Sequence, residues 1–256
     1  MSAVRTRAAT EGAAETAAAV RVTREVVLVG GHESGYGSAL RGLCRETVTG
    51  VGSGLHALTR RPAVVVPMTL GRDAGLVDDV AQVLRWNSRG REPGELLLAP
   101  ALATADHLVG WIRAAAGRVA VPEPEERAIL VAAPAASAAE DAELFRVARL
   151  ARQHSGCRWV EVALIGGDPD VAEGVTRCRL LGARHVVVVP ASFVEPVVPE
   201  DATGSGPLLS PVALEELVGR RVAAAEHRWA EHRDDGLAAA PSGRHEHHHH
   251  DRNHGH

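Results

Sequence analysis

The chain has 256 residues, enough for one large α/β domain or for two domains of about 120 residues, each with its own core. Hydrophobic residues make up 45% of it and charged residues 23%, as in an ordinary globular protein. With a net charge of -4 and no lysine, it offers no basic surface suited to nucleic acid. Three widely spaced cysteines, and no apolar run near the ~20 residues of a membrane span, predict a cytoplasmic protein with no membrane partner.

Both ends of the chain are expected to be disordered. The first 24 residues are rich in Ala, Thr, Arg and Glu and lack the apolar core of a secretory signal. From residue 241 onward no apolar residue is present that could pack into a core. The composition therefore predicts a disordered leader at 1–24 and a disordered tail at 235–256.

Between these ends, continuous apolar runs alternate with segments of helix length. Such runs are typical of strands buried on both faces, which indicates parallel sheets. The expected strands are 26–30, 63–70, 95–100, 128–133, 159–165 and 184–190, and the expected helices are 37–58, 75–87, 106–116, 138–154, 170–181 and 212–232. This alternation predicts a doubly wound α/β fold.

An internal repeat suggests that the fold has two similar halves. Residues 63–100 and 159–190 both predict a strand, a turn containing glycine and aspartate, a helix and a second strand ending in proline. In this alignment Asp73 lies opposite Asp168. A boundary is expected in the proline-rich and charged segment 121–127, which separates an N-terminal half, 25–121, from a C-terminal half, 128–234.

The first candidate site is the loop His32-Glu33-Ser34, directly after the first strand. In an open parallel sheet, ligands bind beyond the carboxyl ends of the strands, so these side chains stand where a ligand would be met. The surrounding glycines fit neither a dinucleotide motif nor a phosphate-binding loop. A histidine that merely caps the following helix is the structural alternative. The corresponding loop of the C-terminal half, 131–137, has no histidine and would form the other wall of the cleft.

His107 is the second candidate, seven residues beyond Pro100 at the end of the third strand. The loops after the first and later strands can converge on one edge of the sheet, so His32 and His107 could face one cavity. Neutral imidazole is a common ligand of divalent transition metals and a base near pH 7. The alternative is an ordinary residue at the start of a helix.

A third feature is the histidine-rich end of the chain. Imidazole clusters of this kind bind nickel, cobalt, zinc or copper without a preformed fold. A purification tag is the alternative, but the run is broken by other residues, which favours a native metal-binding tail. Its histidines are His245, His247, His248, His249, His250, His254 and His256.

These motifs resemble those of the sirohydrochlorin cobalt- and ferrochelatases, class II tetrapyrrole chelatases of the CbiX and SirB type. His32-Glu33-Ser34 resembles the family's His-Gly-Ser, with Glu33 where glycine is usual. Residues 100–107 are similar to its P-x-x-L-x-x-G-x-H loop, with one residue fewer. The segment "PLLSPVALEELVGRRVAAAEHR" is similar to the family's closing helix. The resemblance extends over residues 26–233.

The resemblance implies insertion of Co²⁺ or Fe²⁺ into sirohydrochlorin, on the path to cobalamin or siroheme. The metal, for which Ni²⁺ would also fit imidazole ligands, is then a substrate, and no permanently bound cofactor is expected. A non-catalytic metal-binding or delivery protein on the same scaffold and an unrelated small-molecule α/β enzyme remain alternatives, and pairing of two chains stays open. The predicted catalytic residues are His32, His107 and Glu33, and the predicted substrate-binding residues are Ser34, Arg41 and Arg72.

Overall fold

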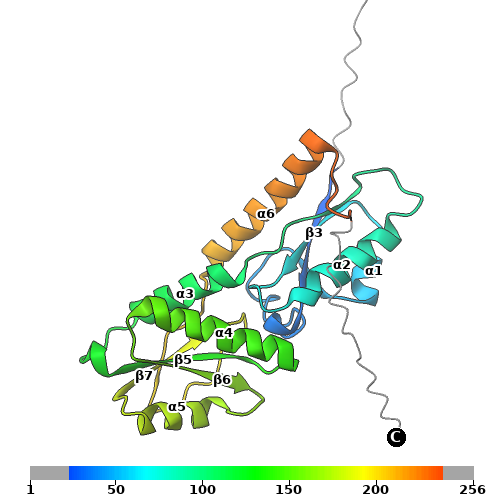
Figure 1. Cartoon of the computed structure of the whole chain (residues 1–256). Coiled ribbons are helices and arrows are strands. Elements are labelled where there is room, and N and C mark those ends of the chain that lie inside the picture. The colour runs from blue at the N-terminus through cyan, green and yellow to red at the C-terminus, as the bar shows by residue number, and fades with distance from the viewer. Residues whose placement is uncertain (1–22, 239–256) are drawn as a thin grey trace, which may run out of the picture.

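A computed structural model of the protein describes residues 23–238 and shows two four-stranded parallel sheets (Figure 1). Their strand orders are β2-β1-β3-β4 and β6-β5-β7-β8, so the two halves repeat one topology. The predicted α/β architecture of two similar halves is therefore confirmed. The strands are β1 (Glu25–Gly30), β2 (Thr47–Gly50), β3 (Ala63–Met68), β4 (Leu96–Leu98), β5 (Arg127–Pro134), β6 (Trp159–Ile165), β7 (His185–Pro190) and β8 (Thr203–Gly204).

Helices cover both faces of each sheet, which explains why the central strands read as unbroken apolar runs. In β1, Val27 and Val29 face a core formed with α1 and α2, whereas Leu28 faces a larger core shared by the two halves. α5 covers the outer face of the second sheet. No helix within 23–238 has the length and hydropathy needed to cross a membrane. The helices are α1 (Ser53–Leu58), α2 (Ala74–Asn87), α3 (Ala105–Arg118), α4 (Ala138–Ser155), α5 (Val171–Leu180) and α6 (Pro211–His232), with short 3-10 turns η1 (His32–Ser34) and η2 (Pro124–Glu126).

The last helix of each half packs against the other half. α3 follows β4 in the chain but contacts β7 and α4, and α6 follows β8 but contacts β3 and β4 (Figure 1). The side chain of Arg221 on α6 donates to the carbonyl of Leu102 at 3.0 Å. Because each sheet is covered by a helix from the other half, the two halves share one core between the sheets.

The predicted helix over 37–58 is wrong. This segment contains a series of turns, β2 and the short helix α1. Gly37 and Gly52 adopt φ values of 87° and 125°, which an α-helix does not contain. The β-branched residues Thr47, Val48 and Thr49 favour a strand between them.

The missed strand also shifted the predicted repeat. Counting from the observed sheet orders, β3 and β7 hold equivalent central positions, whereas β6 is an edge strand equivalent to β2. Asp73 follows β3 and Asp168 follows β6, so these aspartates are not equivalent. The repeat is real in topology, but the alignment of 63–100 with 159–190 was displaced by one strand.

The predicted start of the disordered tail is also too early. The amide of Leu98 donates to the carbonyl of Asp235 at 2.8 Å, and Arg85 Nε donates to the carbonyl of Leu237 at 2.7 Å. Leu237 is buried beside α2. The chain therefore packs on the first sheet at least as far as Leu237. The leader up to residue 22 and the histidines of the tail lie outside the described residues.

The loop between β3 and α2 depends on Gly71, and we expect Gly71→Ala to lower the free energy of unfolding by about 2 kcal/mol or more. Gly71 has φ 106°, and a Cβ there would lie 2.2 Å from the amide nitrogen of Ala105. Urea denaturation measures the effect. Gly110→Ala on α3 is the control, because a Cβ there has open space, and alanine should stabilise that helix by up to ~1 kcal/mol. Equal stability of Gly71→Ala and the parent would contradict the close approach of this loop to α3.

Candidate metal site

Loops that follow strands of both sheets line a common cleft of about 550 Å³. η1 follows β1, the loop to α2 follows β3, and the start of α4 follows β5. The cleft is lined from the first half by His32 and Asp73 and from the second half by Ser137 and Glu140. The carboxyl ends of strands from both sheets therefore form its walls, which is where open parallel sheets bind ligands.

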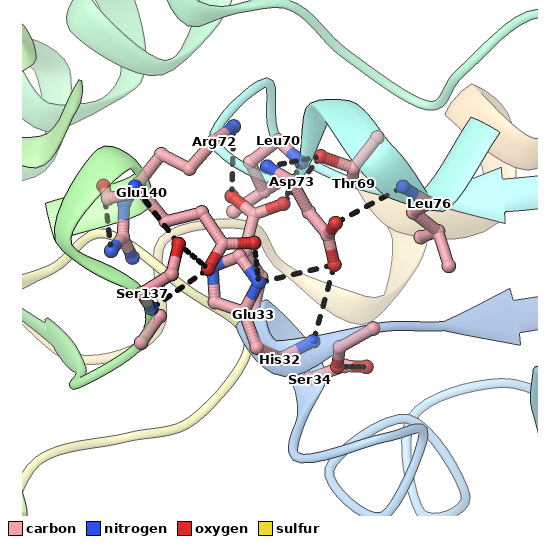
Figure 2. Close-up of polar contacts among 12 residues, drawn as sticks. His32, Glu33, Ser34, Thr69, Leu70, Arg72, Asp73, Leu76, Ser137 and Glu140 are labelled. Atoms are coloured by element: carbon pink, nitrogen blue, oxygen red, sulfur yellow. Dashed lines mark hydrogen bonds and ion pairs between the residues drawn. The ribbon is translucent and has the colours of Figure 1, made fainter. Parts of the chain in front are cut away.

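His32 lies between two carboxylates in the lining of this cleft. Its Nδ1 lies 3.1 Å from Oδ2 of Asp73 and 3.2 Å from Oε1 of Glu140, and Figure 2 shows the three side chains converging. One ligand atom from each of the three lies within 4.8 Å of the others. Two of these separations are close to the roughly 3–3.5 Å between ligand atoms that share an ion at ~2.1 Å. One imidazole and two carboxylates can hold a divalent transition metal.

Both carboxylates are fixed by the helices that they begin. Asp73 caps α2, since its Oδ1 accepts from the amide of Leu76 at 3.1 Å while its Oδ2 accepts from the amide of His32 at 3.3 Å. Glu140 belongs to the capping box of α4, where its Oε2 accepts from the amide of Ser137 at 2.9 Å. Each carboxylate thus has one oxygen used by its helix and presents the other to His32.

The cluster favours a positive charge. Burial opposes protonation of His32, but the hydrogen bond and charge of Asp73, with the charges of Glu33 and Glu140, raise the pKa of the imidazole above its usual value. Burial opposes ionisation of Asp73 as well, yet His32 holds the pKa of this carboxyl below its usual range. Nε2 of His32 is buried and has no hydrogen-bond partner within residues 23–238. A proton or a metal ion can supply the charge that the two carboxylates favour.

Glu33 is fully buried and turns away from the cleft toward the loop after β3. Its carboxylate accepts from the hydroxyl of Thr69 and, at 2.9 Å, from the amide of Leu70. Burial raises the pKa of Glu33, although these hydrogen bonds oppose the shift. In the structure Glu33 therefore holds the loop that carries Asp73. Its predicted catalytic role stays a prediction.

Ser34 and Arg72 are also buried, and their observed contacts are with the protein itself. Their predicted role in substrate binding stays a prediction. The Ser34 hydroxyl donates to the carbonyl of Gly31 at 3.0 Å and accepts from the amide of Gly37 at 3.0 Å. Nη2 of Arg72 donates to the carbonyl of Glu140 at 3.3 Å and lies 3.6 Å from Asp141. Burial lowers the pKa of this guanidinium. Arg72 thus joins the loop after β3 to the start of α4.

His107 and Arg41 are exposed and are not among the residues that line this cleft. Nδ1 of His107 lies 2.8 Å from the hydroxyl of Thr104, and its ring centroid lies 5.8 Å from that of Trp111. The structure does not bring His107 together with His32, and its setting matches the alternative of a helix-start residue. The prediction did not include Asp73 or Glu140 among the site residues. Asp73 had been noted only in the internal repeat, and Glu140 had not been noted. For Glu140 the available signal was the Ser137-x-x-Glu140 capping box directly after β5, which marks a helix start at a strand end.

No family model matches the sequence, and no curated protein matches it. Solved structures do share the fold. SirB from Bacillus subtilis, solved with Fe³⁺, superposes with a TM-score of 0.52 at 14% identity, over 83% of this chain and 100% of SirB. The sirohydrochlorin chelatase SirB of Bacillus subtilis subspecies spizizenii, in complex with cobalt, gives 0.44 at 13% identity over 83% and 100% of the two chains. A multi-domain protein of Deinococcus radiodurans with structural similarity to chelatases gives 0.47 at 18% identity over 82% of this chain, which spans 59% of its length.

The fold is therefore that of the class II tetrapyrrole chelatases. Within that class it is the SirB-type arrangement of two α/β halves, as the sequence resemblance implied.

We expect Asp73→Asn to lower the pKa of the His32 imidazole. The variant removes the charge and the hydrogen-bond acceptor that raise this pKa, while the burial that lowers it remains. Asparagine still caps a helix well, so α2 should keep its start. An NMR pH titration of the ring resonances, with His32→Gln to assign the signal, measures the shift.

Asp79→Asn is the matched control for this titration. Asp79 lines the same cleft but is not among the charges that raise the pKa of His32. An unchanged His32 titration in Asp73→Asn would show that the observed contact does not govern its protonation.

Proposed function

We propose that the protein inserts a divalent metal ion, Co²⁺ or Fe²⁺, into sirohydrochlorin, in the formation of siroheme or cobalamin. The observation that carries this proposal is the His32, Asp73 and Glu140 cluster, which both halves of a chelatase fold build into one cleft. The metal is a substrate that the cluster holds and then releases into the macrocycle.

The chemistry of insertion matches this group of side chains. A divalent ion replaces two pyrrole N–H protons, so one M²⁺ enters the macrocycle and two H⁺ leave it. Two carboxylates balance the charge of the incoming ion, and a neutral imidazole supplies a third ligand. As the ion moves into the macrocycle, the vacated carboxylates and imidazole become bases that can accept the released protons. The raised pKa of His32 suits it to this exchange of a metal ion for a proton.

The cleft also has the dimensions and lining of a small-molecule site. Its volume of about 550 Å³ falls within the usual range of roughly 300–1,000 Å³. Val51, Leu76 and Pro134 give it an apolar wall beside the charged cluster. Such a site can hold the face of a flat, conjugated ring with its central nitrogens directed at the ion.

We expect His32→Ala and Glu140→Gln each to slow metal insertion on the order of 100-fold, because each removes one of three ligands. The rate is followed by the change in sirohydrochlorin absorption after addition of Co²⁺, Fe²⁺, Ni²⁺ or Zn²⁺. Glu143→Gln is the control for charge and helix. Glu143 also lies on α4, but it pairs with Arg146 at 2.7 Å and is not among the residues that line the cleft.

His107→Ala separates the observed cluster from the histidine pair expected from the sequence. His107 lies outside the cleft, so its loss should leave insertion close to the parent rate. A His32→Ala variant that inserts metal as fast as the parent would overturn the assignment of this site. Loss of insertion in His107→Ala alone would favour the sequence-based ligand instead.

A second proposal is a metal-binding or delivery protein without catalysis, and the seven histidines at the end of the chain favour it. A chain ending after Pro241 distinguishes the two proposals, because it lacks the seven tail histidines. An enzyme that works at the cluster should keep its turnover in this variant. If the protein only binds or delivers metal, the shortened chain should bind much less Co²⁺ than the full chain, as measured by equilibrium dialysis of both.

A further inference from the structure

Tyr36 presents an aromatic ring at the wall of the metal cleft. It lies two residues after η1, the turn that carries His32, and it lines the cleft together with His32 and Asp73. It is 71% exposed, which makes it one of the most exposed large side chains of the described residues. The packing of the protein itself therefore does not account for this ring.

The backbone conformation at Tyr36 makes a bulky side chain at this position energetically unfavourable. Tyr36 has φ 55°, in the left-handed region that a bulky side chain disfavours. Its neighbours Gly35 and Gly37 also have positive φ values, 56° and 87°, and there the sequence uses glycine. Only at the central position of this three-residue run does the chain keep a side chain.

Hydrogen bonds from η1 hold Tyr36 in this conformation. Its amide donates to the carbonyl of Gly31 at 2.8 Å, and the Ser34 hydroxyl accepts from the amide of Gly37 at 3.0 Å. The turn is thus fixed on both sides of Tyr36 by the segment that positions His32. A strained residue that the surroundings hold in place beside a binding cleft is a sign of function.

The ring extends the apolar wall of the cleft. Val51, which is 41% exposed, lies in the same lining, as do Leu76 and Pro134. The charged cluster occupies another part of this lining. Exposed aromatic rings bind flat conjugated ligands by offset stacking, which is a contact that aliphatic side chains do not reproduce.

We propose that Tyr36 is a specificity-determining residue that stacks on the face of a planar conjugated macrocycle while its central nitrogens face His32, Asp73 and Glu140. This inference rests on the proposed function, since it takes the tetrapyrrole as the ligand of the cleft. The ring selects for a flat, delocalised ligand, whereas the cluster selects for the ion.

Three variants of Tyr36 test this role by titration of metal-free sirohydrochlorin, followed by its absorption. Tyr36→Phe keeps the ring and should bind like the parent. Tyr36→Leu and Tyr36→Gly lose the ring and should raise the Kd by about 10-fold. Tyr36→Gly should resist urea at least as well as the parent, because glycine adopts positive φ freely, so weaker binding cannot be ascribed to unfolding. The Kd for Co²⁺ alone should stay within twofold in all three, since Tyr36 is not part of the cluster.

The outcomes separate this inference from the proposed function. If the parent binds and metallates sirohydrochlorin and the leucine and glycine variants bind it equally well, stacking by Tyr36 is overturned and the chelatase proposal stands. If binding depends on the ring but no metal is inserted, the stacking role stands and catalysis is overturned. A parent that binds no sirohydrochlorin overturns both.

Discussion

The structure of the site depends on one imidazole held between two carboxylates that belong to different halves of the chain. Asp73 and Glu140 would repel each other across the cleft, and the Asp73 charge does oppose ionisation of Glu140. His32 at 3.1 and 3.2 Å from them relieves this repulsion when it carries a proton. A divalent ion at the same place would do so more completely. A positive charge at this place therefore favours the observed approach of the two carboxylates.

The groups beneath the cluster keep that geometry in place. The carboxylate of Glu33 accepts a hydrogen bond from the loop after β3. The backbone carbonyl of Glu33 accepts from the amide of Phe193 in the second half at 2.9 Å. Arg72 also connects the two halves, through its contacts with Glu140 and Asp141. The exchange of α3 and α6 between the halves adds a shared apolar core. Polar and apolar contacts thus both oppose separation of the two walls, and supports of this kind position metal ligands accurately.

The parts of the fold and site that the sequence could predict are those marked by long hydrophobic patterns. β1, β3, β5 and β7 are buried, continuous apolar runs, so the sheets and the position of His32 at a strand end were predictable. β2 and β8 have four and two residues, too few for a periodic pattern, and losing β2 displaced the repeat. The capping box placed Glu140 at the start of a helix, but its contact with His32 depends on two sheets that face each other, which the sequence does not show. His107 was misplaced because spacing along the chain does not fix the direction of a side chain.

The topology explains how a chain without a second histidine in its equivalent loop brings three candidate metal ligands together. β1 and β5 occupy equivalent positions, so the loop with His32 and the segment leading to Glu140 are related by the repeat and meet in one cleft. One half supplies the imidazole together with a carboxylate, and the other supplies a carboxylate alone. Three protein ligands leave a tetrahedral ion at least one open position. Under the proposed function the ion passes from the protein into a macrocycle and needs such a position, whereas a fully enclosed structural site would retain it.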